Sequence, residues 1–224
     1  GASDNERYAK MGLSNADVAT YPGLTPTKAV EYLRGNQDEE QVTDSSGVTV
    51  AGTFRARSSR LGDIVNSTPV IFTKQENFGF SGLPGTAGTS YTTFIENRRN
   101  SNQQPMVYVG ANDGYLHAFS GTDGREVFGF MPNGALTSIG RLLNPKYQHQ
   151  YYVDGPVAVS DAQIGAAWGT VLVGSTGAGS KSLFALNVTN PSGVGPNQVL
   201  WELDGASNPD IGHMLGKALI VPIN

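Results

Sequence analysis

The 224-residue sequence contains no cysteine, which excludes thiolate catalysis, disulfide bonds and thiolate metal sites. Charged residues make up only 15% of the chain, and the net charge is −4. This balance provides no basic surface for a phosphate backbone, so nucleic acid is not expected as a partner. The sequence also lacks an apolar run of the roughly 18 residues that a membrane-spanning helix requires.

Glycine, in contrast, is abundant, with 29 residues beside 12 prolines. Many turn-forming residues and few charges favour short strands joined by tight turns over long surface helices. We therefore predict an all-β fold, preceded by a short N-terminal helical leader.

The leader covers residues 1–60, which are polar and irregular apart from one predicted helix. Thr25 is a typical N-cap, and Pro26 suits the first helical position. Apolar residues follow at helical spacing, and Gly35 stands where a C-terminal cap belongs. The acidic, turn-rich residues 36–52 are predicted to form a surface loop, and we expect the leader to serve packing and connection.

A four-stranded unit is predicted from residue 61 onward. Its strands are expected at residues 69–72, 106–110, 115–119 and 126–130. Asn112-Asp113-Gly114 is the strongest hairpin signal in the chain. The intervening residues 73–104 are rich in Gly, Ser, Thr and Asn and show little apolar periodicity, so they are predicted to be a long inserted loop.

The same pattern then recurs. Val107–Gly110 matches Val171–Gly174, about 64 residues later, and Leu116–Phe119 matches Leu183–Leu186. The first and last strands of the second unit are expected near Pro156–Ala158 and Val199–Trp201, and Leu215–Ile223 resembles the first strand of a third unit.

Four-stranded repeats of this kind are typical of β-propeller blades, which close rings of four to eight units. Two units and a fraction cannot close a ring. We therefore predict that residues 61–224 are a partial β-propeller belonging to a longer protein. Its unpaired strand edges are a possible route to self-association.

Three histidines and one glycine-rich stretch are the candidates for a reactive site. His117, His149 and His213 stand in no recognisable metal or catalytic motif and are expected to be structural or exposed. Gly174–Gly179 precedes Lys181-Ser182, but a strand follows instead of a helix. This stretch is therefore predicted to be a turn and not a phosphate loop or nucleophile elbow.

Two further groups have competing interpretations. Arg98-Arg99, with asparagines at 97, 100 and 102, is either a polar contact surface or, as we favour, a solvated loop tip. Asp204, Asn208 and Asp210 approach a calcium-binding pattern most closely, but a strand-end turn is favoured. Trp168 and Trp201 are expected in the core or between blades. No catalytic, cofactor-binding or metal-binding residue is assigned.

Whole phrases of the sequence resemble the C-terminal, quinoprotein-like propeller of the PilY/PilC family of type IV pilus proteins. The phrases, in order, are Tyr32–Gly35, Leu61–Val70, Val107–Phe119, Tyr147–His149, Tyr152–Gly155 and Thr170–Gly179. The resemblance extends from about residue 29 to the C-terminus.

The resemblance implies a non-enzymatic protein exported to the bacterial cell surface, at the pilus tip and associated with the outer membrane. Such proteins support pilus assembly with minor pilins and the pilus machinery, oppose retraction, and adhere to host cells or abiotic surfaces. It also implies no cofactor in this fragment, with calcium in a later blade of the full-length protein. Arg34-Gly35-Asn36 replaces the Arg-Gly-Asp of some members, so integrin binding there is not expected.

Two alternatives share the repeat pattern. A quinoprotein dehydrogenase has similar blades, although its axial carboxylates, arginines and metal are not recognisable in this sequence. A general propeller scaffold for envelope assembly, unrelated to pili, is the other.

Overall fold

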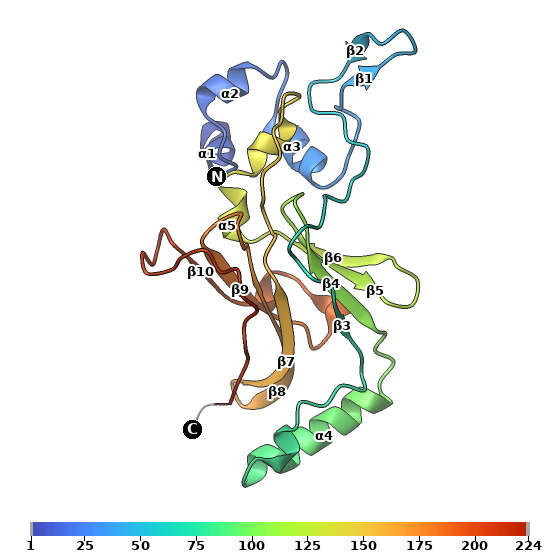
Figure 1. The fold of residues 1–224 in the computed structure, drawn as a ribbon, viewed down its shortest axis with the longest axis vertical. Coiled ribbons are helices and arrows are strands. Elements are labelled where there is room, and N and C mark those ends of the chain that lie inside the picture. The colour runs from blue at the N-terminus through green and yellow to red at the C-terminus, as the bar shows by residue number, and fades with distance from the viewer. Residues whose placement is uncertain (1, 223–224) are drawn as a thin grey trace.

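Two four-stranded antiparallel sheets form the centre of the computed structural model, which describes residues 2–222 (Figure 1). The first sheet has the order β3 (Val70–Phe72), β4 (Met106–Gly110), β5 (Leu116–Ser120) and β6 (Glu126–Phe130). The second has the order β7 (Val157–Ile164), β8 (Ala167–Ser175), β9 (Ser182–Asn187) and β10 (Val199–Asp204). Each sheet is thus a meander of sequential strands, joined by turns or by the inserted helix.

The eight strands predicted for the two units are confirmed within a few residues. Tyr108 pairs with Ala118 in the first sheet, and Leu172 pairs with Leu186 in the second. The predicted β4–β5 hairpin turns at Gly114, whose φ of 97° is a conformation that side chains with a Cβ rarely adopt.

The leader is more helical than predicted. It contains α1 (Asp4–Lys10), α2 (Asn15–Ala19) and α3 (Pro26–Leu33), followed by the small hairpin of β1 (Val42–Thr43) and β2 (Thr49–Ala51). The Thr25 cap of α3 is confirmed, because its hydroxyl accepts a hydrogen bond from the Lys28 amide at 3.2 Å. The prediction of a single helix was wrong, since α1 and α2 each begin at a capping box, at Ser3 and at Ser14.

The predicted insertion loop at residues 73–104 contains a helix, so the loop prediction was wrong. The insertion forms the 3₁₀ turn η1 (Phe80–Gly82) and the 15-residue helix α4 (Thr86–Asn100). The Tyr91 ring of α4 lies 4.7 Å, between centroids, from the ring of Trp168 on β8. Tertiary packing therefore compensates for a sequence poor in strong helix formers.

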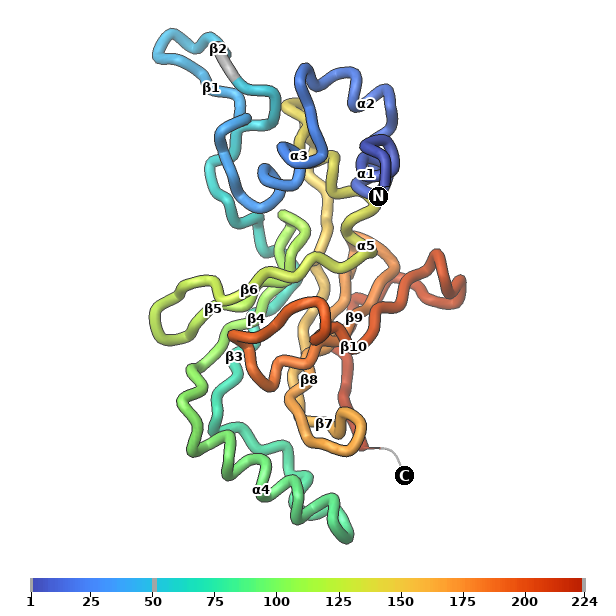
Figure 2. Tube along the Cα trace, turned by 180° about the vertical axis from the view of Figure 1, so that it is seen from behind, coloured from blue at the N-terminus to red at the C-terminus, as the bar shows by residue number. Residues whose placement is uncertain are grey.

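The molecule is a mixed α/β structure, which corrects the all-β prediction. In Figures 1 and 2 the leader helices cap one end of the paired sheets and α4 lies at the opposite end. The remaining short helical segments are α5 (Asn133–Leu136), η2 (Ile139–Leu143), η3 (Pro191–Gly193) and η4 (Pro196–Gln198).

The main core lies between the two sheets and extends under the leader. Phe130 of β6 packs against Phe184 of β9, with ring centroids 5.2 Å apart. Tyr32 lies where the leader meets the segment between the sheets. Its hydroxyl is 3.0 Å from the carbonyl oxygen of Arg55, in the leader, and 3.1 Å from that of Leu142, in the segment between the sheets. Because each tyrosine hydroxyl has one proton, one of these contacts is the donated hydrogen bond.

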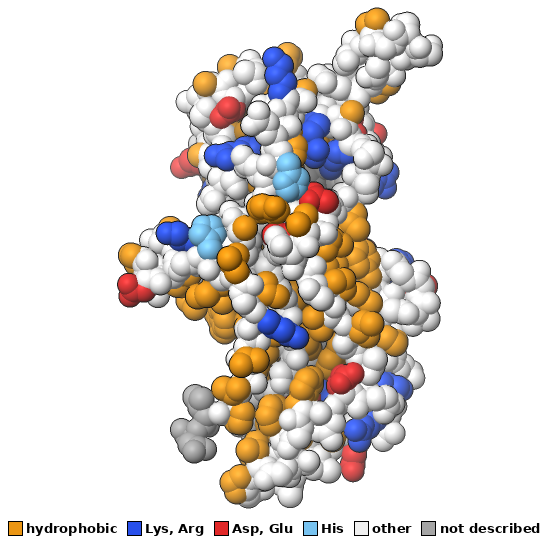
Figure 3. All heavy atoms as spheres, viewed as in Figure 1, with side chains coloured by type: hydrophobic (Ala, Val, Ile, Leu, Met, Phe, Trp, Pro, Cys, Tyr) orange, Lys and Arg blue, Asp and Glu red, His pale blue; other side chains and the backbone are white. Residues whose placement is uncertain are grey.

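The C-terminal segment does not form the strand predicted at Leu215–Ile223. No strand is assigned between residues 205 and 222, and Ile223 lies outside the described residues. Ala218 and Ile220 nevertheless pack on the outer face of the second sheet, while Leu219 is 84% exposed. Apolar side chains are also visible over the middle of the molecule in Figure 3.

Trp168 and Trp201 have different environments. Trp168 contacts the α4 insertion of the first sheet and so packs between the two units, as predicted. Trp201 on β10 is 41% exposed among the described residues. This contradicts the prediction that it lies in the core or between units.

Candidate functional site

Residues 61–69 connect the leader to the first sheet, and we call them the linking segment. This segment also contacts the neighbouring loops. The Gly62 amide donates to Oδ2 of Asp113 at 2.7 Å, in the β4–β5 turn. In return, the Asn112 amide donates to the Asp63 carbonyl at 3.0 Å. A Cβ on Gly62 would lie 2.3 Å from the Asp113 nitrogen, so only glycine fits this approach.

The second half of the linking segment reaches both sheets. The Gly110 amide, at the end of β4, donates to the Ser67 hydroxyl at 2.9 Å. The Asn66 amide donates to Oδ1 of Asp154 at 2.9 Å, and Asp154 is buried just before β7. Through its backbone and polar side chains, the linking segment therefore connects the first sheet to the chain that enters the second sheet.

His149 belongs to the same network, on its exposed side. Its Nε2 lies 2.8 Å from Oδ2 of Asp63, and both side chains are about half exposed. Burial alone would raise the pKa of Asp63, but hydrogen bonds from Asn112 and His149 outweigh it and lower that pKa. His149 was predicted to be structural or exposed, and its side chain is 49% exposed.

His117 on β5 is buried, with 8% of its surface exposed, and lies between two carboxylates. Its Nδ1 is 2.6 Å from Oε1 of Glu126, and its Nε2 is 3.0 Å from Oδ2 of Asp113. Burial lowers the pKa of His117, but the hydrogen bonds and charges of Asp113 and Glu126 outweigh burial and raise it. Because carboxylates face both ring nitrogens, the doubly protonated imidazolium fits this cluster best.

The structural role predicted for His117 agrees with this geometry, but its carboxylate partners were missed. Asp113 precedes His117 by four residues, and this spacing was the signal available in the sequence. In the hairpin, the turn folds Asp113 back toward the ring, and Glu126 arrives from the adjacent strand β6.

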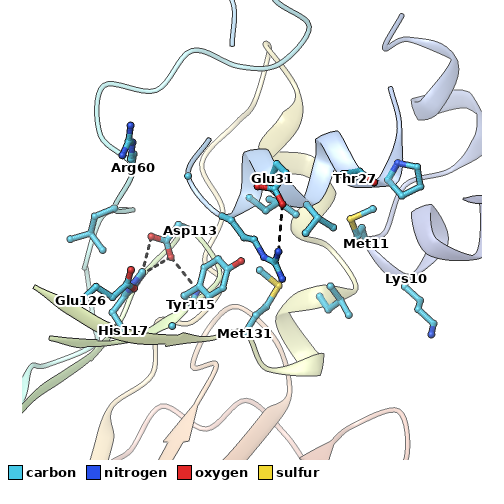
Figure 4. Close-up of a pocket in the computed structure, with 18 of the residues that line it drawn as sticks. Lys10, Met11, Thr27, Glu31, Arg60, Asp113, Tyr115, His117, Glu126 and Met131 are labelled. Atoms are coloured by element: carbon cyan, nitrogen blue, oxygen red, sulfur yellow. Dashed lines mark hydrogen bonds and ion pairs between the residues drawn. The ribbon is translucent and has the colours of Figure 1, made fainter. Parts of the chain in front are cut away.

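The His117 cluster lines one wall of a cavity of about 990 Å³ (Figure 4). The opposite wall is formed by α1 and α3 of the leader, and Arg60 lies at the edge. Tyr115, Met131 and Met11 contribute apolar surface to the cavity. It is larger than a second cavity, of about 430 Å³, which lies beside Asp63 and His149.

Arg98 is buried, which corrects its interpretation as part of a solvated loop tip or polar contact surface. Its side chain is 4% exposed, and Nη1 lies 2.6 Å from Oδ1 of the fully buried Asp161 on β7. Tyr91 and Thr170 also donate to that carboxylate, at 2.8 and 2.9 Å. Arg98 further donates to the carbonyl of Glu76. This arginine therefore attaches the insertion of the first sheet to the second sheet.

The glycine-rich stretch at residues 174–179 is a turn between two strands, as predicted. The Thr176 amide donates to the Ser182 carbonyl at 3.1 Å, and β9 begins immediately at Ser182. His213 lies beside this turn, with Nδ1 2.9 Å from the Gly177 carbonyl oxygen.

Asp204 forms the predicted strand-end turn. Its carboxylate accepts hydrogen bonds from the amides of Ala206 and Ser207, at 3.0 and 2.7 Å. These bonds lower the pKa of Asp204. Among residues 2–222, no group of three or more His, Asp or Glu side chains is arranged to hold a metal ion.

Most polar groups of these sites therefore form hydrogen bonds or ion pairs within the chain. They join the linking segment, turns and insertion to the sheets, and the cavity is the described feature best suited to receiving an external group. No helix between residues 2 and 222 is both long enough and apolar enough to cross a membrane.

Comparison with known proteins identifies relatives over almost the whole chain. A type IV pilus biogenesis factor PilY1 homologue of Xylella fastidiosa (strain Temecula1) is 46% identical over 221 residues, covering 96% of this chain and 15% of that protein. PilY1 of Pseudomonas aeruginosa (strain PAK) is 37% identical over 226 residues, covering 100% and 18%. The chain thus spans less than a fifth of the length of these curated relatives.

A crystal structure of the Pseudomonas aeruginosa PilY1 C-terminal domain shares 43% sequence identity, with a TM-score of 0.43, over 57% of this chain and 23% of that chain. The family model described as the PilY1 beta-propeller domain matches residues 61–218. The resemblance inferred from the sequence phrases is confirmed: this chain belongs to the PilY1 family of type IV pilus biogenesis factors.

Proposed function

We propose that this chain is a section of a longer, non-enzymatic pilus-tip protein, in which the two sheets are consecutive quinoprotein-like blades of a β-propeller. Membership of the PilY1 family is the observation that carries the proposal. The boundary between leader and propeller is proposed at residue 60, and the start of a third blade near residue 215.

A repeated connection between the sheets supports the arrangement as blades. Before the second sheet, the Tyr152 amide donates to the Asn112 side chain at 3.0 Å, so the chain lies over the β4–β5 turn. After the second sheet, the Ser175 hydroxyl donates to the Met214 carbonyl at 2.8 Å, so the chain lies over the β8–β9 turn. In both places the chain that leaves one sheet lies over a turn of that sheet, as expected where the chain of a propeller passes from one blade to the next.

We further propose that the longer protein is exported and acts at the cell surface, at the pilus tip and in association with the outer membrane. There it would bind minor pilins and the pilus machinery, support assembly, oppose retraction and contribute to adhesion to host cells or other surfaces. A scaffold role is supported by the way the linking segment uses its polar groups to hold sheets and loops together.

Calcium is proposed only for parts of the longer protein other than residues 2–222. Calcium needs about six to eight oxygen ligands, whereas the Asp204 carboxylate is already engaged by the amides of its own turn. A quinone cofactor is not part of the proposal. Reconstitution of the longer protein with a quinone and calcium, followed by absorbance, tests the dehydrogenase alternative directly.

The experiment for the pilus role is complementation of a deletion strain with the longer protein, in three forms. The wild type is compared with Asn66→Asp, which replaces the side-chain amide that donates to the buried Asp154 with a second carboxylate. Asn100→Asp is the matched control, because Asn100 is exposed at the end of α4. Surface pili and minor pilins retained by the tagged protein are measured together.

We expect wild type and Asn100→Asp to restore pili and retain minor pilins, and Asn66→Asp to lose both. The proposal is wrong if the deletion strain is normally piliated. It is also wrong if the wild-type protein retains no pilin, which would leave a general envelope scaffold as the better interpretation.

A further inference from the structure

The cavity between the leader and the first sheet has an unbalanced charge. Arg7, Lys10, Arg34 and Arg60 line it, and all four are exposed in a chain whose net charge is negative. We call this cavity the cationic groove.

The bases of the groove are only weakly engaged by the chain itself. Arg34 lies 3.5 Å from Oε1 of Glu31, with both side chains about half exposed or more. Arg60 donates to the neutral side chain of Gln37 at 3.3 Å. Lys10 forms no ion pair within 4 Å in the described part of the chain. Exposed pairs at these distances contribute little, so the bases remain available to an external anion.

The acidic groups on the sheet side of the groove are, in contrast, already engaged by hydrogen bonds and ion pairs within the chain. The Asp113 carboxylate accepts hydrogen bonds from the amides of Gly62 and Tyr115 and faces the His117 ring. Glu126 faces the other nitrogen of that ring at 2.6 Å. The imidazolium offsets one of these two carboxylates. With Glu31 as the third lining acid, three carboxylates stand against four bases and the imidazolium, so the groove presents a net positive charge.

Apolar surface lies between the bases. Met11 and Leu33 are buried in the leader wall, while Val30 and Met131 are half-buried along the groove. A ligand that fits this combination carries carboxylates beside aliphatic side chains. Polypeptide segments with alternating acidic and aliphatic residues have this chemistry, and a positive surface favours their association through electrostatic complementarity.

We propose that the cationic groove binds an acidic, aliphatic segment of a separate protein. Many of the lining residues belong to α1 and α3, among them the bases Arg7 and Lys10, and Arg34 is the C-cap of α3. A further sheet packed on the first would cover the β5–β6 wall without matching the helical wall, which favours a separate segment. The inference rests on the proposed scaffold role and identifies the surface through which a partner is held.

The test measures fluorescence anisotropy of a short labelled peptide of alternating glutamate and leucine, titrated with this chain. A peptide of alternating lysine and leucine is the charge control. The test variant is Arg34→Gln with Arg60→Gln, and the matched control is Lys146→Gln with Lys217→Gln, two exposed bases outside the groove. Circular dichroism checks that every variant is folded, and Met131→Gln tests the apolar contribution.

We expect the acidic peptide to bind, the groove variant to bind it roughly tenfold more weakly, and the control variant to bind it as the wild type does. Binding should also weaken as salt increases. Equal binding of both peptides, or an unaffected groove variant, would overturn the proposal.

The longer protein provides the second arm of the test. If it binds the acidic peptide as this chain does, the groove is open to a separate partner. If only the short chain binds, the groove is filled by the same polypeptide and the separate-protein proposal is wrong. If the wild-type chain does not bind the acidic peptide but the wild-type longer protein restores pili, the groove proposal is wrong and the pilus role stands. If the chain binds the acidic peptide but the longer protein retains no minor pilin, the pilus role is wrong and the groove proposal stands.

Discussion

The buried ion pair between Arg98 and Asp161 gives the sharpest prediction about stability. It joins α4, inserted into the first sheet, to β7 of the second sheet, and its two side chains are 4% and 0% exposed. Replacing Arg98 with Met leaves the Asp161 carboxylate buried with only two hydroxyl donors, from Tyr91 and Thr170. Removing one partner of a buried pair typically costs about 3–5 kcal/mol.

This cost is large beside the roughly 5–15 kcal/mol by which domains are usually stable. The second variant, Arg98→Met with Asp161→Asn, removes the buried charge while keeping an oxygen for the two hydroxyls. We therefore expect its loss of unfolding free energy to be at least about 1 kcal/mol smaller than the sum of the two single losses.

The assay is urea unfolding followed by circular dichroism, with the slope checked for two-state behaviour. Lys28→Met is the control, because Lys28 pairs with Glu39 at 2.7 Å with both side chains at least one-third exposed. That change should cost less than about 1 kcal/mol. An Arg98→Met variant as stable as Lys28→Met would refute the interpretation of Arg98 as the attachment between sheets.

Three further predictions follow from local geometry. The folded-state pKa of His117 is raised above 6.5, so its stabilisation is complete below that pH and is lost as the pH rises through the folded value; denaturation of His117→Gln across that range should lack this loss. Gly62→Ala should destabilise the chain by about 1–3 kcal/mol, because its Cβ meets backbone, whereas Gly82→Ala meets open space and should melt near the wild-type temperature. If unpaired surfaces drive self-association, light scattering should show a mass that rises with concentration and falls in Leu219→Asp, a change at an 84% exposed side chain; a constant monomer mass would contradict it.

The strands were predictable because their signal is local and repeated. Val107–Gly110 and Val171–Gly174 share apolar residues of high strand propensity, and each run is followed by glycine-containing turns. The two capping boxes, Ser3 with Glu6 and Ser14 with Asp17, were equally local, and their sequence signal was available for α1 and α2.

The helix α4 was harder to predict because its stability comes from elsewhere in the chain. Its serines, threonines and glycine are weak helix formers. Its buried face was marked only by Gly88, Tyr91, Ile95 and Arg98, which are three or four residues apart. The partners of that face, Asp161 and Trp168, are more than sixty residues away and provided no local signal.

The candidate site was only partly predictable for a similar reason. The turn at Asn112-Asp113-Gly114 was clear, but its contacts with Gly62 and Asp63 bring together segments about fifty residues apart. The cationic groove likewise forms only when the leader helices face the first sheet, so no single stretch of sequence contains it.

Amide hydrogen–deuterium exchange tests the propeller arrangement most directly, by comparing residues 213–222 in this chain and in the longer protein. Here Ala218 and Ile220 of this segment pack on the outer face of the second sheet, and the segment has no strand pairing among the described residues. If the two sheets are consecutive blades, the segment gains strand partners in the longer protein, and its exchange there should be slower by orders of magnitude. Equally fast exchange in both proteins would contradict a third blade and the propeller built on it.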